Sequence, residues 1–140
     1  MELQHDVERT LTELDHARLT RLTQRVAAPA TRNDDHPLAQ TLDDSELVPS
    51  RTIPDDVVTM HSKVLLRDLE TSRRYRLTLC YPEDAEPAAG WVSVLSPVGA
   101  SLLGLQVGAE ARWTQPDGER RAALLEAILF QPESSGDYTL

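Results

Sequence analysis

Three consecutive side chains, Asp34, Asp35 and His36, lie in a turn-like stretch of the sequence, AAPATRNDDHP. Paired carboxylates supply the oxygen ligands that divalent cations prefer, so this stretch could hold a metal ion. An Asp pair directly before a helix is also what helix capping produces, because side-chain oxygens accept hydrogen bonds from the first free N–H groups. We favour the simpler interpretation, in which the Asp pair caps a helix and its charges are solvated in the turn. We keep the three residues as a candidate contact surface for a partner.

The histidines and the single cysteine do not indicate a metal centre or a nucleophile. His5, His16, His36 and His61 fall on different predicted elements, without the close spacing or the neighbouring cysteine that zinc sites use. Cys80 lies in a predicted strand with no base near it in the sequence, so we expect a buried, unreactive thiol. No metal and no cofactor are therefore expected.

A second stretch, Ser-Pro-Val-Gly at 96–99, places a serine beside glycine and proline. The G-x-S-x-G pattern of a nucleophile elbow is absent, so the stretch is interpreted as a strand that ends and passes into a short helix. Further on, the spacing of Gly104 and Gly108 does not match a strand-loop-helix phosphate motif. Neither feature predicts catalysis.

Composition excludes several classes of function. The chain has 140 residues with 14 Lys and Arg against 23 Asp and Glu, a net charge of -9, which is a poor footprint for nucleic acid or an anionic membrane. No stretch approaches the roughly 20 apolar residues of a membrane span, and the N-terminus lacks a signal-peptide pattern, so the cytoplasm is expected. Aromatic residues make up 4%, and Trp91 and Trp113 are expected in the core or on a sheet face.

The first third of the chain has the apolar spacing of an amphipathic helix. Thr12, with Asp15 three residues later, resembles a capping box, so the helix is expected to begin near Glu13. Pro29 should stop it, because proline cannot continue a helix interior. The apolar stripe consists of Leu11, Leu14, Leu19, Leu22 and Val26.

A second, shorter helix should follow, with Asp34 or Asp35 as its cap and Pro37 in its first turn, and Pro49 should end it. Two such helices joined by a loop form an αα-hairpin. Because each stripe is narrow, each helix should pack mainly against the other and the hairpin should project. Asp34, Asp35 and His36 would then form its tip.

The rest of the chain alternates like β-strand and is interrupted by Pro and Gly. Leu102 and Leu103 are expected to face inward from its only helix. Together these elements predict an α+β domain around an antiparallel sheet. The expected strands are 58–66, 76–81, 91–95, 111–114 and 123–130, with the helix at 98–105 and a turn at 116–118.

The order of short motifs in this second part resembles the Rnk family, the regulators of nucleoside diphosphate kinase, which are related to the transcript-cleavage factors GreA and GreB. The resemblance covers residues 53–140 and is carried by DVVTMHSKV, LTLCYPEDA, VSVLSPVGASLLGLQVGAEARWTQPDGE and ILFQPESSGDYTL. Before residue 53 it extends only to architecture and to scattered positions such as Asp15, Leu19 and the LDDSELVP segment.

The resemblance implies an FKBP-like domain at 50–140 after an antiparallel coiled coil at 1–49. It implies a non-enzymatic regulator that binds RNA polymerase at its secondary channel, competes with Gre factors and has a possible effect on nucleoside diphosphate kinase levels. In Gre factors an acidic tip supports a catalytic magnesium; in Rnk proteins the coil is shorter and cleavage is not expected. The family motif gives further candidate docking residues: Ser96, Pro97, Gly99, Leu103 and Gly104.

Two alternatives remain open. The chain could be a true cleavage factor that acts through Asp34 and Asp35. It could also be a peptidyl-prolyl isomerase, although active members need an aromatic-lined pocket and this sequence holds one Phe, three Tyr and two Trp. No sequence-specific nucleic-acid contact and no membrane contact are expected, and the sequence predicts no oligomeric state.

Overall fold

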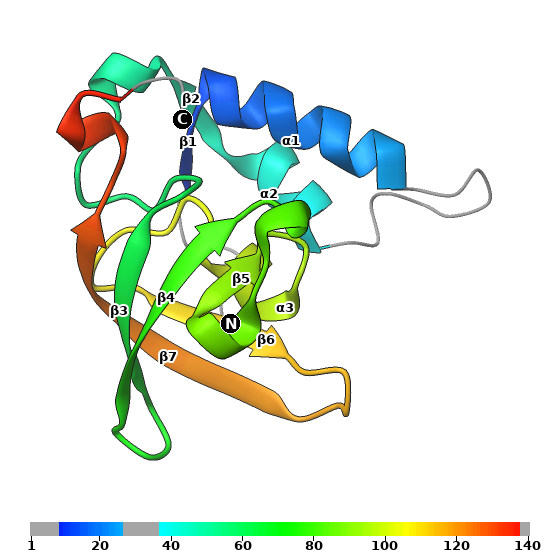
Figure 1. Cartoon of the computed structure of the whole chain (residues 1–140), viewed down its shortest axis with the longest axis vertical. Coiled ribbons are helices and arrows are strands. Elements are labelled where there is room, and N and C mark those ends of the chain that lie inside the picture. The colour runs from blue at the N-terminus through cyan, green and yellow to red at the C-terminus, as the bar shows by residue number, and fades with distance from the viewer. Residues whose placement is uncertain (1–8, 27–36, 138–140) are drawn as a thin grey trace.

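The computed structural model describes residues 9–26 and 37–137. Five strands form one curved sheet in the order β5-β4-β3-β7-β6 (Figure 1). Three α-helices accompany this sheet within the described residues, which confirms the α+β prediction. The strands are β3 Lys63–Asp68, β4 Arg74–Cys80, β5 Trp91–Ser93, β6 Glu110–Thr114 and β7 Arg120–Phe130.

The sequence predicted an antiparallel sheet, but one pair of strands is parallel. The β3–β4, β3–β7 and β6–β7 pairs are antiparallel, but β5 runs parallel to β4. The connection between β4 and β5 contains two short 3-10 turns, Pro82–Asp84 and Pro87–Ala89, and it brings the chain back so that Trp91 pairs with Thr78. The FKBP-like character implied by the resemblance stays a prediction.

Strand β3 begins later than its alternating pattern predicted. The segment 58–62 is not strand, because His61 has a positive φ of 70° and reverses the chain direction. A tight turn precedes it, in which the Thr59 N–H donates to Ser62 Oγ at 2.9 Å. From Lys63 onward the alternation holds, with Val64 and Leu66 buried on the core face.

Helix α1 (Glu13–Val26) begins where its cap predicted. The Asp15 N–H donates to Thr12 Oγ1 at 2.9 Å, which is one half of a capping box. The second half is absent, because the Asp15 carboxylate accepts instead from the Met60 N–H at 3.2 Å. Asp15 therefore takes part in the cap of α1 and also joins this helix to the turn that precedes β3.

Helix α2 (Pro37–Asp44) starts at the predicted proline but ends five residues before Pro49. The residues after it form β2 (Glu46–Val48), which pairs in parallel with β1 (Thr10–Thr12) just before α1. This pairing satisfies backbone groups that a longer helix would have satisfied internally, and the Glu46 N–H donates to the Arg9 carbonyl at 2.9 Å. The extension of the second helix to Pro49 was therefore wrong.

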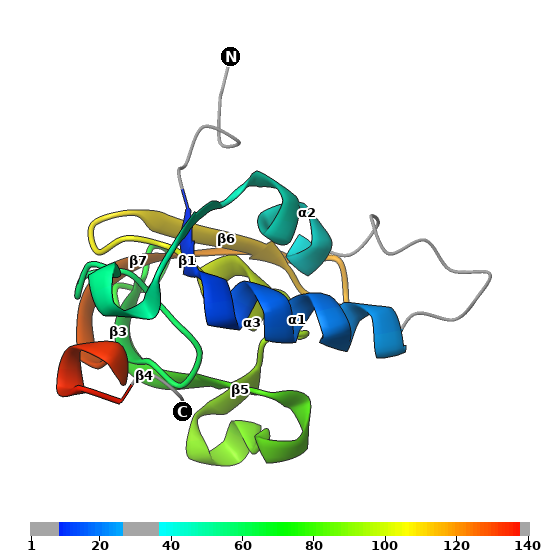
Figure 2. The same ribbon diagram turned by 90° about the horizontal axis from the view of Figure 1, so that it is seen from above.

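The helices do not project as a self-contained hairpin. Leu11, Leu19, Leu22, Leu38 and Leu42 belong to the same buried cluster as the apolar residues of the sheet and of α3 (Pro97–Leu102). Helix α2 contacts both α1 and α3, and Figure 2 shows α1 and α2 lying along the body of the molecule. None of the helices described here is long and apolar enough to cross a membrane.

The C-terminal segment is ordered against the body as far as residue 137. Gln131 is buried, and its side-chain amide donates to the carbonyls of Pro54 and Val57, both at 2.8 Å. Glu133 accepts from Thr59 Oγ1 at 2.7 Å. These contacts make residues 131–133 part of the fold.

Candidate functional site

The family motif builds the entry into α3. Ser96 is the N-cap: its Oγ accepts from the Gly99 N–H at 3.1 Å and donates to the Ser93 carbonyl at 2.6 Å. Pro97 occupies the first helical position, where a missing N–H costs nothing. The prediction that a strand ends here and a short helix begins is confirmed, but β5 ends at Ser93 rather than at residue 95. Helix α3 starts one residue earlier and ends three residues earlier than the expected 98–105.

The glycines of the motif are required by close packing. A Cβ on Gly99 would lie 2.0 Å from the Ser93 carbonyl oxygen, so no other residue fits without a backbone shift. Gly104 has a φ of +78° and lies against the N-terminal strand, where an added Cβ would meet Arg9 and Leu11 at 3.1 and 3.2 Å. Leu103 is fully buried.

The motif residues therefore divide into two groups. Gly99, Leu103 and Gly104 shape the segment from inside, and none presents an exposed side chain. Ser96 and Pro97 are only half-buried, so of the five candidates they are the ones a partner can reach without rearrangement.

Arg9, the residue before β1, links this strand to the C-terminal end of α3 by hydrogen bonds. One guanidinium nitrogen donates to the carbonyls of Ser101 and Leu103 at 2.9 and 2.8 Å. A cation at a helix C-terminus also meets the negative end of the helix dipole. Burial lowers the pKa of Arg9, although the group stays charged at any ordinary pH.

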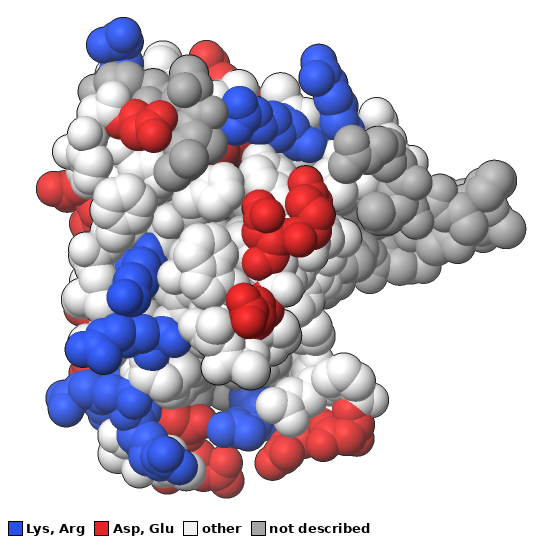
Figure 3. Space-filling model, in the orientation of Figure 1, with Lys and Arg blue, Asp and Glu red and all other residues white. Residues whose placement is uncertain are grey.

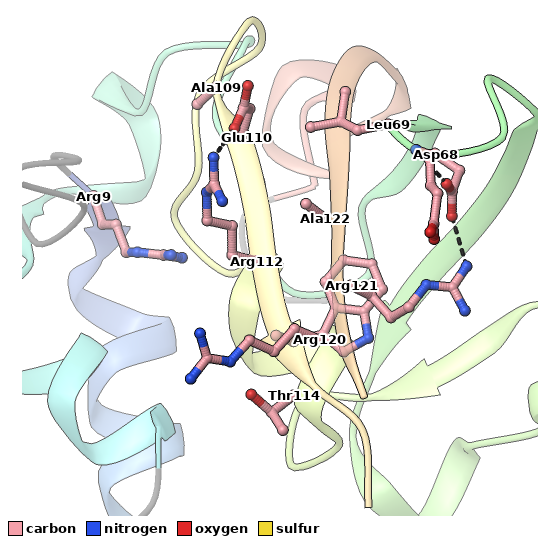
Figure 4. A pocket seen from close by; sticks show the side chains of 12 residues that line it. Arg9, Asp68, Leu69, Ala109, Glu110, Arg112, Thr114, Arg120, Arg121 and Ala122 are labelled. Atoms are coloured by element: carbon pink, nitrogen blue, oxygen red, sulfur yellow. Dashed lines mark hydrogen bonds and ion pairs between the residues drawn. The ribbon is translucent and has the colours of Figure 1, made fainter. Parts of the chain in front are cut away.

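A hollow of about 1270 Å³ opens beside Arg9 and the β6–β7 hairpin (Figure 4). The strand register places Arg112 opposite Ala122 and Thr114 opposite Arg120, so these four residues share one face of the hairpin. Arg121, on the other face, donates to Asp68 at 2.6 Å, and this contact lowers the pKa of Asp68 to about 2. The hollow could not be predicted from the sequence, because Arg9 is about 100 residues away from the β6–β7 hairpin that it faces.

Charge is unevenly distributed over the surface. Figure 3 shows Lys and Arg side chains gathered over β3 and β4, although the chain as a whole is acidic. Glu126 lies among them and accepts from Arg67 at 2.9 Å and from Arg74 at 2.7 Å. Net charge therefore does not describe each face of this protein.

The junction of α1 with the sheet holds a buried carboxyl that sequence reasoning treated only as a cap. The Asp15 side chain is 3% exposed, and burial raises its pKa to about 6. The neighbouring Glu133 carboxylate raises it further, while the Met60 N–H and the Arg18 guanidinium oppose the shift. Its partner Met60 is 45 residues away, so no local pattern could have revealed the contact.

The remaining sequence-predicted residues fall in several places. Asp34, Asp35 and His36 lie outside the described residues. Within residues 9–26 and 37–137, no group of three or more His, Cys, Asp or Glu side chains could hold a metal ion. His61 Nδ1 is buried without a hydrogen-bond partner in that same part of the chain, and the His61 ring lies 5.6 Å from the Tyr81 ring.

Cys80 and the tryptophans lie close to their predicted positions. Cys80 is fully buried, its thiol donates to the Val92 carbonyl at 3.4 Å, and burial raises its pKa, so the reactive thiolate is disfavoured. Trp113 packs against the core, as expected. Trp91 lies on the edge strand β5 and is 40% exposed.

Comparison with known proteins identifies the group to which this fold and motif belong. The family model described as "Transcription elongation factor, GreA/GreB, C-term" matches residues 53–128, more than half of the chain. The chain belongs to the GreA/GreB family. The matched region contains the whole α3 motif and all five strands of the main sheet, apart from the last two residues of β7.

Within the GreA/GreB family, the chain is similar to proteins of two kinds. It is 38% identical over 99 residues to the Escherichia coli (strain K12) "Regulator of nucleoside diphosphate kinase", covering 71% of this chain and 73% of that one. It is 29% identical over 91 residues to GreA of Helicobacter hepaticus, covering 65% of this chain and 56% of that one. The recognition of the Rnk family is thereby confirmed.

A solved GreA/GreB structure confirms the fold at greater length. The GreA/GreB elongation factor from Nitrosomonas europaea superimposes with a TM-score of 0.70 at 33% identity, covering 88% of this chain and 98% of that one. This match extends beyond the residues of the family model, so the similarity includes part of the N-terminal segment.

Proposed function

We propose that this GreA/GreB-family protein is an RNA polymerase-binding transcription regulator of the Rnk type. In this proposal it docks at the secondary channel, competes with Gre factors and does not stimulate transcript cleavage. The support comes from the family match and from similarity to a named regulator over most of both chains. A secondary effect on nucleoside diphosphate kinase levels would follow from altered transcription.

The observation that carries the proposal is that α1 and α2 are short and pack against the body of the molecule. Helix α1 has 14 residues, about 21 Å at roughly 1.5 Å per residue, and α2 has 8. Leu19, Leu22 and Leu38 are buried in the common core, so both helices are committed to packing against the body. Packing of both helices on the body supports the proposal that this segment occludes the mouth of a channel rather than reaching a distant catalytic centre.

Cleavage stimulation requires an acidic group at the reacting centre. A misplacement on the order of 1 Å can reduce a rate roughly a hundredfold, and an arm that stops short misplaces the group by much more. We therefore propose that Asp34, Asp35 and His36 contact polymerase at the tip without supporting a catalytic magnesium.

The docking surface proposed on the body is the exposed part of the α3 entry, Ser96 and Pro97. Gly99, Leu103 and Gly104 would act indirectly by holding that entry in shape. In this proposal residues 1–49 form the arm and residues 50–140 the docking domain, although the two share one core.

Co-purification with core RNA polymerase tests the proposal, with a Gre factor added as competitor. We expect the full chain to bind and to be displaced by the competitor. Pro97→Ala should weaken binding about fivefold or more, as loss of an interface contact does, while leaving the fold intact, because alanine is tolerated at a first helical position. Pro87→Ala is the matched control, since Pro87 also opens a short helix and is exposed.

Two results would reject the proposal. Absence of the chain from purified polymerase, at concentrations where a Gre factor binds, would remove the polymerase as partner. Strong stimulation of cleavage in a backtracked complex, abolished by Asp34→Ala with Asp35→Ala, would instead assign the chain to the cleavage factors.

A further inference from the structure

Three guanidinium groups from three separate elements face the hollow beside β6. In Figure 4, Arg9, Arg112 and Arg120 lie on one side of the β6 ribbon, while Arg121 points away toward Asp68. Arg112 and Arg120 are diagonal neighbours across the β6–β7 pair, which places their Cα atoms about 7–8 Å apart. Side chains as long as arginine can close on one ligand from that separation.

The charges of these groups are incompletely compensated. Arg112 donates to Glu110 at 2.6 Å. Among the residues that the structure describes, Arg9 donates only to backbone carbonyls and Arg120 has no hydrogen-bond or ion-pair partner. The lining also holds Glu70 and Asp68, and Asp68 is paired with Arg121. A guanidinium taken out of water without a counter-charge is unfavourable, so an anion in the hollow would relieve the cost at Arg9.

The shape of the hollow leaves room for such an anion. Ala109 and Ala122 contribute only methyl groups to its lining, and Thr114 contributes a hydroxyl that can donate a hydrogen bond. At about 1270 Å³ the open space exceeds what one small ion fills. The planar fork of arginine matches the oxygen spacing of phosphate and binds it bidentately.

We propose that Arg9, Arg112 and Arg120 form a binding site for phosphate groups, fitted to a small molecule that carries two or more of them. A small ligand is favoured over a long nucleic acid because the three guanidinium groups lie around one hollow rather than along an extended basic track. This site is separate from the α3 entry proposed for polymerase docking, and its test does not depend on polymerase binding.

Isothermal titration of the full chain with sodium pyrophosphate tests the site, at constant ionic strength. We expect saturable binding that Arg120→Gln weakens about tenfold, which is the usual effect of losing one charge-assisted contact. Arg112→Gln should weaken it as well. The matched control is Arg76→Gln, an exposed arginine on β4 that does not line the hollow, and it should change the affinity less than twofold.

Two further ligands distinguish the sources of anion. A short single-stranded oligonucleotide that binds more tightly than pyrophosphate, and loses affinity in Arg120→Gln, would assign the phosphate site to a phosphodiester backbone. A poly-glutamate peptide that binds while pyrophosphate does not would overturn the proposal. It would equally fail if no ligand bound at millimolar concentration, or if Arg76→Gln weakened pyrophosphate as much as Arg120→Gln.

Discussion

At the scale of single residues, Asp15 is the group whose chemistry departs furthest from what its sequence position indicates. Its backbone N–H uses the Thr12 cap, and its carboxylate accepts from Met60 in a buried junction. Burial raises the pKa of Asp15 to about 6, above its ordinary value of 3.8. The folded protein therefore binds a proton at Asp15 more tightly than the unfolded chain does.

The first prediction concerns pH. With the folded pKa above the unfolded one, the stability linked to Asp15 is fully present below about pH 4 and is lost as the pH rises through 6. Asp15→Asn removes this dependence and keeps an acceptor for Met60. At pH 8 we expect the variant to be more stable than the native chain, by up to about 3 kcal/mol.

Urea unfolding at pH 4 and pH 8 measures the difference between the two proteins, which isolates Asp15 from other carboxyls. Asp43→Asn, on the exposed side of α2, is the matched control and should follow the native pH profile. A stability difference between native chain and Asp15→Asn that stayed constant from pH 4 to pH 8 would contradict the prediction.

The second prediction concerns the motif glycines. Gly99→Ala should destabilise the fold by about 3 kcal/mol, because the new methyl overlaps the Ser93 carbonyl and forces the backbone to move. Gly108→Ala should cost only about 1–2 kcal/mol, since Gly108 has a φ of +98° but open space around its Cβ position. Equal losses in thermal unfolding would show that the contact at Gly99 relaxes freely.

At the scale of elements, a strand could be predicted from the sequence when its pairing partner is close in the chain, and could not when the partner is distant. Strands β3 and β4 pair with each other across a short turn, and their alternating residues predicted them well. Strand β2 pairs with β1 across both helices, and nothing in the Glu46–Val48 sequence indicates so distant a partner. The segment 58–62 alternates like strand, but the left-handed His61 ends that pattern.

The candidate site followed the same rule. The start of a short helix near Ser96 and the inward position of Leu103 could be predicted from neighbouring residues, whereas the capping role of the Ser96 hydroxyl was found only in the structure. The convergence of Arg9 with Arg112 and Arg120 could not, because it depends on how β1 and the β6–β7 hairpin are placed by the whole fold.

The third prediction concerns the start of α3. Ser96→Ala should destabilise the protein by about 1–2 kcal/mol, because the Gly99 N–H loses its cap and the Ser93 carbonyl loses a donor. Ser96→Asp retains a capping acceptor and should recover most of the stability. Guanidinium unfolding of both variants measures this, and equal loss in the two would mean that the hydroxyl acts through its donor bond alone.

At the scale of the whole molecule, the N-terminal helices and the five-stranded sheet share one core. Leu11, Leu19 and Leu38 pack in the same cluster as Leu102 and Leu103. The fourth prediction follows: a fragment of residues 50–140 should unfold at lower urea concentration than the full chain and should bind a hydrophobic dye. The reason is that removal of the N-terminal helices exposes apolar surface that they cover in the full chain.

The full chain is the reference for this comparison, and both proteins are unfolded under the same conditions. A fragment that matched the urea midpoint and the cooperativity of the full chain would show that residues 50–140 are a fully independent domain, and would contradict the prediction. Loss of cooperative unfolding would show that the shared core determines the unit of folding.

The parallel pairing of β1 with β2 has a consequence for the length of the arm. The segment that contains α1 and α2 begins at β1 and ends at β2. Pairing of these two strands therefore holds the two ends of that segment together. Once the ends are closed, each doubling of the enclosed chain costs only about 0.6 kcal/mol of loop entropy. Residues can therefore be inserted between α1 and α2 with little effect on the five-stranded sheet and its core.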